Sequence, residues 1–414
     1  MILLAHPFGN QNVRAVLGAL DRAGLLAKFV TALGWSQASR VLHRLPPNLQ
    51  SRMARRSYDL PYGKIKIFPA REIIRLVAQK MRQRWLVDQE EGWASIDRVW
   101  RELDKFAADA LRKSYSRQSI STVYGYEDCA AQLFETAREI GVRRIYDLPI
   151  AHWQTVQRLL HEEAQRYPEW EPTLGGIRDS EEKLARKTRE LDLAELVICP
   201  SAFVLDSLPD DVRVSKKCLV TPFGSPALDE EERAERRRLE KPLRILFVGA
   251  LTQRKGLADL FAAMKLIDSQ EIELVVMGSL LRPLAWYRQQ FPRFFYAPPR
   301  PHREVLRLMR SCDVLVLPSI VEGRALVQQE AMACGLPLIV TRNAGGEDLI
   351  AEGETGFLVP IRDPEAIAEK VNWCATNRAN LSGMAIAAQK RASELTWHDY
   401  GEKVIAAIRS LTGE

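Results

Sequence analysis

Four short, continuous apolar segments in the second half of the chain constrain its fold more than any other feature. They read LRILFVGA, IELVVMGS, VLVLPS and LPLIVT. Continuous apolar runs of this length are typical of parallel strands that are buried on both faces of a sheet. Between them, apolar residues recur at helical spacing, for example at positions 257, 260, 261 and 264. This alternation of strands and helices predicts a doubly wound α/β sheet.

The first half repeats the alternation more weakly, in the segments ILLA, STVYGY, RRIYDL and ELVICPS. A chain of 414 residues is long enough for two or three domains. We therefore predict two Rossmann-like domains that face each other across a cleft, formed by residues 1–222 and 223–395. The prolines and dense charge of residues 222–241 predict a connector. A last helical pattern, residues 396–414, is expected to cross back to the first domain.

The composition is that of an ordinary globular protein. Hydrophobic residues make up 46% and charged residues 27%, which excludes wholesale disorder, collagen and coiled coil. No apolar run approaches the roughly 18 residues that cross a bilayer, and the start of the chain lacks the pattern of a signal peptide. The six cysteines show no metal-ligand spacing, so we interpret them as small buried side chains. We expect a cytoplasmic protein.

A basic segment interrupts the first half. Residues 40–85 hold 12 Lys or Arg and 2 Asp or Glu, a local charge of 12 − 2 = +10, whereas the whole chain carries +6. The surrounding residues 30–120 are helical in pattern and rich in Trp, so we interpret them as a helical insertion. Apolar positions 73, 74, 77 and 81 form a stripe flanked by basic residues.

Two interpretations of this stripe stay open. In the first, the stripe docks on an anionic membrane surface or on a lipid-diphosphate acceptor. In the second, it packs on the first domain as an ordinary amphipathic helix. No nucleic-acid-binding motif is present, so no nucleic acid partner is expected.

Two glutamates lie where the third strong strand of the second half meets a helix. Glu322 and Gly323 are in the loop, the helix is predicted to begin near Arg324 or Ala325, and Glu330 follows about six residues, or roughly 9 Å, along it. A helix start at a strand end suits a phosphate. The two carboxylates would then bind hydroxyl pairs on either side, as a nucleotide sugar requires. The alternative is two glutamates on a solvated helix start.

A second element follows the first strong strand, in FVGALTQRKG. The strand ends at Gly249, and Arg254 and Lys255 precede a helix. Two cations at this strand end would clamp a diphosphate. The alternative is an ordinary surface pair.

Taken together, these segments resemble the retaining family-4 glycosyltransferases of the GT-B fold. The resemblance rests on VGALTQRKG, GSLL, PSIVEGRALVQQEAMACGLPLIVT and AGGEDLIAEGETGFLVP. Glu322 and Glu330 match the E-x7-E motif of that family. The likeness is clear over residues 243–373 and weaker in the first half, where ELVICPSAFVLDSL and LVTPFG carry it.

The resemblance implies roles for these residues. Glu322 would bind the hydroxyls of the donor sugar, and Glu330 would bind the donor ribose. Lys255, assisted by Arg254, would neutralise the diphosphate.

Backbone groups complete the implied donor site. The N–H groups of Gly323, Arg324, Ala325 and Leu326 would contact sugar and phosphate. Gly9, in the loop after the first strand, matches a glycine that lets the backbone of the first domain approach the diphosphate.

The sequence departs from the family pattern at two positions. Gly249 matches the glycine that opens the pattern G-R-L, but Ala250 replaces its phosphate-binding arginine, and whether Arg254 substitutes for it is open. Arg324 stands where an aromatic residue is common. It would either reshape the sugar pocket or reach a phosphate or an acidic sugar.

The family also places a histidine near the sugar, after a central strand of the first domain. His152 is the best match, although Asp147 occupies the strand end. His6, at the end of the first strand, is a weaker candidate.

The implied reaction is transfer of a sugar from a nucleoside diphosphate to an acceptor hydroxyl, with retention of configuration. The donor would bind mainly to the second domain and the acceptor mainly to the first. The product would belong to bacterial-type glycan, polysaccharide or glycolipid synthesis, with a glycan or a lipid-linked acceptor, at the inner face of the membrane or in the cytoplasm. Because no D-x-D motif occurs, we expect no metal and no other cofactor.

Two other activities stay open on the same fold. The first is a nucleotide-sugar epimerase. The second is a non-catalytic nucleotide-binding protein recruited to membranes.

Overall fold

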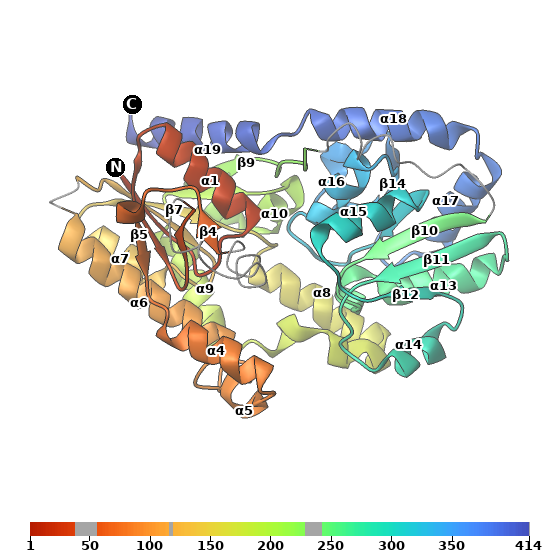
Figure 1. Ribbon diagram of the computed structural model, residues 1–414, viewed down its shortest axis with the longest axis horizontal. Helices are drawn as coiled ribbons and strands as arrows, with labels where there is room; N and C mark the ends of the chain where they lie inside the picture. Colours follow the sequence, from red (N-terminus) through yellow and green to blue (C-terminus); the bar gives the residue numbers. More distant parts are fainter. Residues whose placement is uncertain (38–55, 116–118, 228–241, 414) are drawn as a thin grey trace.

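The computed structural model describes residues 1–37, 56–115, 119–227 and 242–413. It contains two large parallel sheets, each flanked by helices (Figure 1). The first sheet has the strand order β5 (Ile65–Ile67), β2 (Leu26–Thr31), β1 (Ile2–Ala5), β6 (Thr122–Tyr126), β7 (Arg143–Asp147), β8 (Leu196–Cys199) and β9 (Lys217–Val220). The second has the order β12 (Phe295–Ala297), β11 (Ile272–Met277), β10 (Leu243–Val248), β13 (Val314–Leu317), β14 (Leu338–Thr341) and β15 (Gly356–Val359). The predicted pair of Rossmann-like domains is confirmed.

Burial explains why the strong strands are continuously apolar. All four residues of β13 and all four of β14 are buried, since helices cover both faces of the sheet. Every strand pairing among the described residues is parallel, as in Leu243 with Ile272 and Ile245 with Val314. The order of the second sheet reverses direction at the neighbouring strands β10 and β13, so the loops that leave their carboxyl ends lie side by side.

In the described part of the first domain, α-helices connect the strands of the sheet. They are α1 (Gln11–Arg22), α4 (Ala70–Lys80), α5 (Arg84–Val87), α6 (Ile96–Ser114), α7 (Ala131–Glu139), α8 (Trp153–Arg166), α9 (Glu181–Leu193), α10 (Ala202–Ser207) and α11 (Asp210–Ser215). Ser95 and Ser180 cap α6 and α9 with their side chains, which satisfies backbone N–H groups that helix geometry leaves free.

The helices of the second half are α13 (Leu257–Ile267), α14 (Leu284–Gln290), α15 (His302–Arg310), α16 (Leu326–Ala333), α17 (Pro364–Thr376), α18 (Asn380–Ser393) and α19 (Trp397–Thr412). Asp363 caps α17 with its side chain, and Pro364 occupies the first helical turn, where its missing N–H costs nothing.

The insertion is not wholly helical, and the prediction was wrong on this point. Residues 65–67 form β5, which pairs with β2 in the register Phe29 to Ile65. Ser57–Tyr58 forms the short strand β4, paired with β3 (Trp35–Ser36). The alternation Ile-Lys-Ile suits an edge strand, where a lysine on the strand discourages pairing with another chain. Residues 38–55 of the insertion lie outside the described residues.

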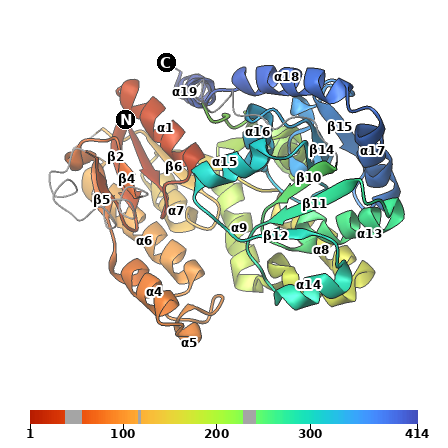
Figure 2. The ribbon, with the colours of Figure 1, turned by 45° about the vertical axis from the view of Figure 1, so that its right-hand side comes forward.

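Two chain segments join the domains side by side (Figures 1 and 2). The Ser225 N–H donates to the Leu395 carbonyl at 2.8 Å, and the rings of Phe223 and Trp397 stack 5.9 Å apart. Beyond this point α19 packs along α1, where Tyr400, Val404 and other apolar residues complete the core of the first sheet. Most of the predicted connector, residues 228–241, lies outside the described residues.

The segment after β7 reaches the second sheet. Trp170, in the short helix η2 (Pro168–Thr173), is buried in the core of the second sheet, with its ring 6.0 Å from Phe261 and 4.8 Å from Trp286. A part of the chain that precedes the predicted domain boundary thus packs on the donor side. This contact anchors the segment after α8 on helices α13 and α14 of the second domain.

Candidate functional site

The site begins with three charged side chains at the carboxyl ends of β10 and β13. Lys255 Nζ lies 2.5 Å from Glu322 Oε1, and Arg254 Nη1 lies 2.9 Å from the same oxygen. The Glu322 side chain is only 12% exposed. Burial alone would raise the pKa of Glu322, but the positive charges of Lys255 and Arg254 outweigh it and lower the pKa. Glu322 is therefore an ionised carboxylate between two cations.

Backbone hydrogen bonds hold the two loops together. The Ile320 N–H donates to the Arg254 carbonyl at 2.9 Å, and Arg254 Nη1 donates to the Val321 carbonyl at 3.2 Å. The Glu322 N–H donates to the Asn343 carbonyl at 3.0 Å. The positions of the cations and of the carboxylate are thus fixed relative to each other.

Two glycines make this approach feasible. Gly249 has φ +149°, and a Cβ there would lie 2.5 Å from Lys255 Cδ, so the lysine stem rests on the bare backbone. Gly256 has φ +72°, and its Cβ would lie 2.0 Å from the Pro318 carbonyl oxygen. Gly249 therefore serves the site by leaving room for Lys255.

A buried network that the sequence did not reveal supports the cation loop. Gln253 is fully buried, and its Nε2 donates to Glu163 Oε2 at 2.6 Å and to Asp259 Oδ2 at 2.7 Å. Thr252 Oγ1 donates to the Thr173 carbonyl at 2.7 Å. Glu163 precedes Gln253 by 90 residues. No local pattern signals such a contact, which depends on α8 packing against the second sheet.

The start of α16 is pressed against the first domain. The Ser201 hydroxyl donates to the Gly323 carbonyl at 2.7 Å, and a Cβ on Gly323 would lie 1.7 Å from the Pro149 carbonyl oxygen. Helix α16 begins at Leu326, one or two residues later than the predicted start near Arg324 or Ala325. Only glycine fits at this contact between the domains.

The backbone N–H groups at this helix start are not equivalent. Those of Gly323, Arg324 and Leu326 make no hydrogen bond to any described residue. The Ala325 N–H donates to the Ala344 carbonyl at 3.1 Å. The Ala325 N–H therefore already has a hydrogen-bond acceptor. This geometry does not support the implied contact between that amide and the sugar nucleotide.

The Arg324 side chain does not face the cleft, which corrects the expectation that it reaches a phosphate or an acidic sugar. It is fully buried and forms a bidentate ion pair with Asp348, at 2.6 Å and 3.1 Å. Its Nε donates to Gln329 Oε1 at 2.9 Å and its Nη1 to the Gly345 carbonyl at 3.0 Å. The guanidinium has a structural role, since it ties the start of α16 to the segment after β14.

Glu330 lies further along α16. It is four residues beyond Leu326, or about 6 Å, rather than the roughly 9 Å expected. Its Oε1 is 3.0 Å from His302 Nε2 on α15, and its side chain is 22% exposed. His302, which the sequence analysis did not single out, thus lies beside the predicted ribose ligand.

His152 is the first-domain candidate whose ring nitrogens have no hydrogen-bond partner among the described residues. It is buried at the N-terminus of α8. Burial, then the nearby charge of Lys187, lowers its pKa to about 4, so the imidazole is neutral near pH 7.

The other two first-domain candidates are engaged in the interior. Asp147 is buried and accepts a hydrogen bond from the Tyr124 hydroxyl at 2.8 Å. His6 Nδ1 accepts from the Phe8 N–H at 3.0 Å, and its ring meets Tyr126 edge-on at 4.7 Å. Both side chains therefore have structural partners.

Gly9 has a different neighbour from the one implied. A Cβ on Gly9 would lie 2.2 Å from Cε1 of Tyr58, so the buried Tyr58 ring of the insertion occupies the space beside it. Its carbonyl accepts a hydrogen bond from Arg14 Nε at 2.8 Å. The structure explains this glycine by ring packing.

A cavity of about 180 Å³ adjoins the cations on the first-domain side. Its walls include Arg254, Trp153, Glu127 and Lys187. Lys187 Nζ lies 3.6 Å from Glu127 Oε1, and burial raises the pKa of Glu127 to about 7. The cavity offers both charged groups and an aromatic wall next to the predicted diphosphate clamp.

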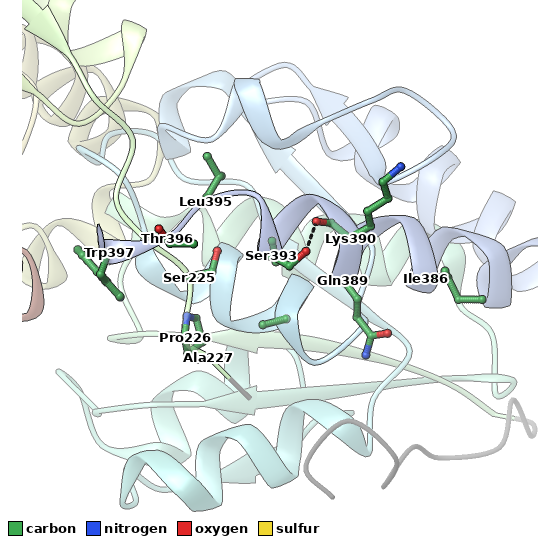
Figure 3. A pocket seen from close by; sticks show the side chains of 12 residues that line it. Ser225, Pro226, Ala227, Ile386, Gln389, Lys390, Ser393, Leu395, Thr396 and Trp397 are labelled. Carbon is green, nitrogen blue, oxygen red and sulfur yellow. Dashed lines mark hydrogen bonds between the residues drawn. The ribbon is translucent and has the colours of Figure 1, made fainter. Parts of the chain in front are cut away.

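A second cavity, of about 600 Å³, lies elsewhere. Figure 3 shows it between the interdomain segment Ser225–Ala227 and the end of α18, with Trp397 at its edge. None of the predicted site residues lines it. It borders the point where the chain leaves the described residues, at Ala227, and it plays no part in the site.

Two parallel-sheet domains with a charged site between them define the class of two-domain GT-B proteins, and comparison with known proteins supports this. The chain superposes over its full length on sucrose-phosphate synthase of Thermosynechococcus elongatus, with a TM-score of 0.65, 18% identity and 99% of that chain covered. It also matches the Anabaena protein HepE solved with UDP-glucose, with a TM-score of 0.61 and 15% identity over 99% of both chains.

Sequence comparison identifies the family of the second domain. Residues 229–391 match the family model described as glycosyl transferases group 1. A D-inositol 3-phosphate glycosyltransferase of Corynebacterium efficiens is 29% identical over 235 residues, 53% of this chain and 54% of that protein. Matches to four such corynebacterial proteins span between 27% and 59% of their lengths. The second domain is therefore a group 1 glycosyltransferase domain on a GT-B fold.

Proposed function

We propose that the protein transfers a sugar, with retention of configuration, from a nucleoside diphosphate sugar to an acceptor hydroxyl. The observation that carries this proposal is the ion-paired group Lys255, Arg254 and Glu322 beside the start of α16. Fixed cations and free amide groups stabilise the negative charge that develops on a leaving diphosphate. A buried carboxylate next to them suits sugar hydroxyls, which donate hydrogen bonds to it.

Each cation keeps N–H groups with which it could bind the sugar nucleotide. A lysine ammonium has three N–H groups, and Lys255 uses one of them to donate to Glu322. An arginine guanidinium has five, and in Arg254 the contacts with the Val321 carbonyl and Glu322 involve only Nη1. The amides of Gly323, Arg324 and Leu326 would bind the phosphates, and Glu330 would bind the ribose diol. His152 would contact the sugar from the first domain, and Gly249 would contribute by seating Lys255.

The chemistry needs no protein nucleophile. In the proposed step the bond between the sugar and the diphosphate breaks, the bond to the acceptor oxygen forms on the same face, and the leaving phosphate takes the acceptor proton. The fixed cations would supply the charge stabilisation without a metal. UDP is the first nucleotide to test, because the HepE structures were solved with UDP and UDP-glucose.

The acceptor is proposed to be a glycan or a lipid-linked glycan that enters from the first-domain side, at the membrane surface. The cavity beside Arg254 supports this direction, because Trp153 offers a face for a sugar ring and Glu127 and Lys187 offer hydrogen-bonding groups. Closure of the domains would exclude water from the reacting bond.

A panel of UDP-, GDP- and ADP-sugars in a thermal-shift assay identifies the donor. The donor that stabilises the protein is then incubated with saccharide and lipid-linked acceptors, and the configuration of the new bond is read by NMR. We expect retention with the wild type and no product with a folded Glu322→Ala variant. A changed sugar nucleotide formed without any acceptor would indicate an epimerase instead, and turnover by Glu322→Ala would contradict the proposal.

A further inference from the structure

Helices α4 and α5 expose a row of large apolar side chains. Val77 is 50% exposed, Met81 63% and Trp85 67%, and Ile73 and Ile74 are also exposed. The only buried residues of α4 are Glu72 and Ala78. The interpretation that this stripe packs on the first domain is therefore wrong. A contiguous apolar surface of this kind is typical of an interaction site rather than of a free surface.

The basic residues around the row fall into two groups. Arg71 ties α4 to α6, since it donates to Glu102, and Arg75 pairs within α4 with the buried Glu72 at 2.6 Å. Lys80, Arg82 and Arg84 form no ion pair with any described residue. The second group therefore presents three basic side chains without an ion-pair partner among the described residues, next to the exposed apolar row.

The helix pair is placed for contact with a large surface. Figures 1 and 2 show α4 and α5 projecting from the first domain, on the side of the molecule opposite α19. Three acidic residues follow α5, and one of them, Glu90, accepts hydrogen bonds from Ser180 at the start of α9. That carboxylate is directed toward the body of the domain.

We propose that this face, defined by Ile73, Val77, Met81 and Trp85, docks on an anionic lipid bilayer. Helix α4 would lie in the plane of the interface with its apolar row among the upper acyl chains. Trp85 suits the headgroup level, and Lys80, Arg82 and Arg84 suit anionic headgroups. This proposal rests on the proposed function, because docking would bring the first domain to a lipid-linked acceptor. Such docking requires no membrane-spanning segment. Within the described residues, no helix has the length and apolarity to cross a bilayer.

Two other occupants fit the face less well. A symmetric contact with a second copy would bring the same three basic residues of each copy together, and like charges oppose such a contact. A nucleic acid would leave the aliphatic side chains of Ile73 and Val77 exposed.

Vesicle co-sedimentation tests the proposal directly. We expect the wild type to bind vesicles of mixed phosphatidylcholine and phosphatidylglycerol, with affinity that falls as salt rises, and to bind phosphatidylcholine alone far more weakly. The variant V77S/M81S/W85S should lose at least about 100-fold in partition coefficient, because it removes the apolar row. The variant K80Q/R82Q/R84Q should lose a similar factor, of about 100-fold, because each basic group near the surface contributes several-fold.

The control variant L266S/I386S removes two exposed apolar side chains elsewhere and should bind like the wild type. Glu322→Gln should also bind vesicles normally, which separates docking from the transferase proposal. Equal binding to both vesicle types, no binding to either, or full binding by V77S/M81S/W85S would overturn the proposal. It would also be overturned if sedimentation showed a dimer that the triple variant abolishes, with no vesicle binding.

Discussion

Lys255 Nζ and Glu322 Oε1 lie 2.5 Å apart, although the two residues are 67 positions apart in sequence. The contact exists because β10 and β13 are neighbours in the second sheet and both loops leave the same edge. It places a cation and a hydroxyl acceptor where a diphosphate and a sugar would meet.

The first prediction concerns Lys255 itself. Lys255→Met should lower kcat by about 100- to 1,000-fold, because it removes one preorganised charge from the leaving diphosphate. The donor Kd should rise less than kcat falls. Steady-state kinetics measure both, and Lys265→Met, on the exposed side of α13, is the matched control with wild-type activity expected. An unchanged kcat would mean that another group stabilises the leaving charge.

Gly249 offers a test in which no charge is altered. Gly249→Ala places a methyl group 2.5 Å from Lys255 Cδ and also disfavours the φ of +149°. We expect the lysine to be displaced and activity to fall toward that of Lys255→Met, while the protein remains folded. In the background of Lys255→Met, the alanine should cost little further activity. Additive losses would show that Gly249 acts independently of the lysine.

Glu330 is expected to bind the donor and to leave the chemical step unaffected. Glu330→Gln should weaken donor binding by about 10- to 100-fold, which is the usual cost of losing a hydrogen bond to a charged group. Calorimetric titration with the nucleoside diphosphate measures this, since the ribose contact does not depend on the sugar. Glu304→Gln, an exposed position on neighbouring α15, should bind normally. Unaltered affinity in Glu330→Gln would contradict the ribose assignment.

The Arg324–Asp348 pair should control stability. Asp348→Ala leaves a fully buried guanidinium without its carboxylate, and we expect a loss of about 3–5 kcal/mol in the free energy of unfolding. Arg324→Met should cost less, because Asp348 is partly exposed and can be hydrated. The double variant should be more stable than Asp348→Ala alone. Urea unfolding of the three variants measures these free energies. If Asp348→Ala were as stable as the wild type, the structural role of the Arg324–Asp348 pair would be contradicted.

Asp147 gives a prediction about pH. Burial raises its pKa in the folded protein to about 7, above the ordinary value of 3.8, and its hydrogen bonds from tyrosine hydroxyls only partly oppose this. The folded state then binds more protons than the unfolded state between these values. Its contribution to stability is therefore full below about pH 4 and is lost as the pH rises to about 7. Asp147→Asn should remove this component, so the stability of the wild type relative to Asp147→Asn should fall over that range. A constant difference would show that the carboxyl titrates normally.

The alternating strands and helices of the second domain could be predicted from the sequence. Continuous apolar runs predicted the strands of the second sheet, and helical spacing predicted α13 and α15, because burial on both faces leaves a strong local pattern. The same patterns placed Lys255 and Glu322 at strand ends. The contact between these two side chains depends on β10 and β13 being neighbours in the sheet, which the structure shows.

Directions of side chains were not predictable. Arg324 turns into the domain because it pairs with Asp348, which lies 24 residues further on in the short 3-10 helix Glu347–Leu349. Gly9 is explained by Tyr58, and Gln253 by Glu163, and both contacts join distant segments without a local signature. The exposure of α4 was also undecided by pattern, since an amphipathic helix has the same spacing whether its apolar face is buried or free.

The most direct test of the central claim is a crystal structure of Glu322→Gln bound to the nucleotide sugar that stabilises the protein most. We predict phosphate oxygens within hydrogen-bonding distance of Lys255 Nζ and the Leu326 N–H, with the ribose diol on Glu330 and the sugar beside residue 322. A diphosphate bound away from Lys255 and the start of α16 would contradict the account.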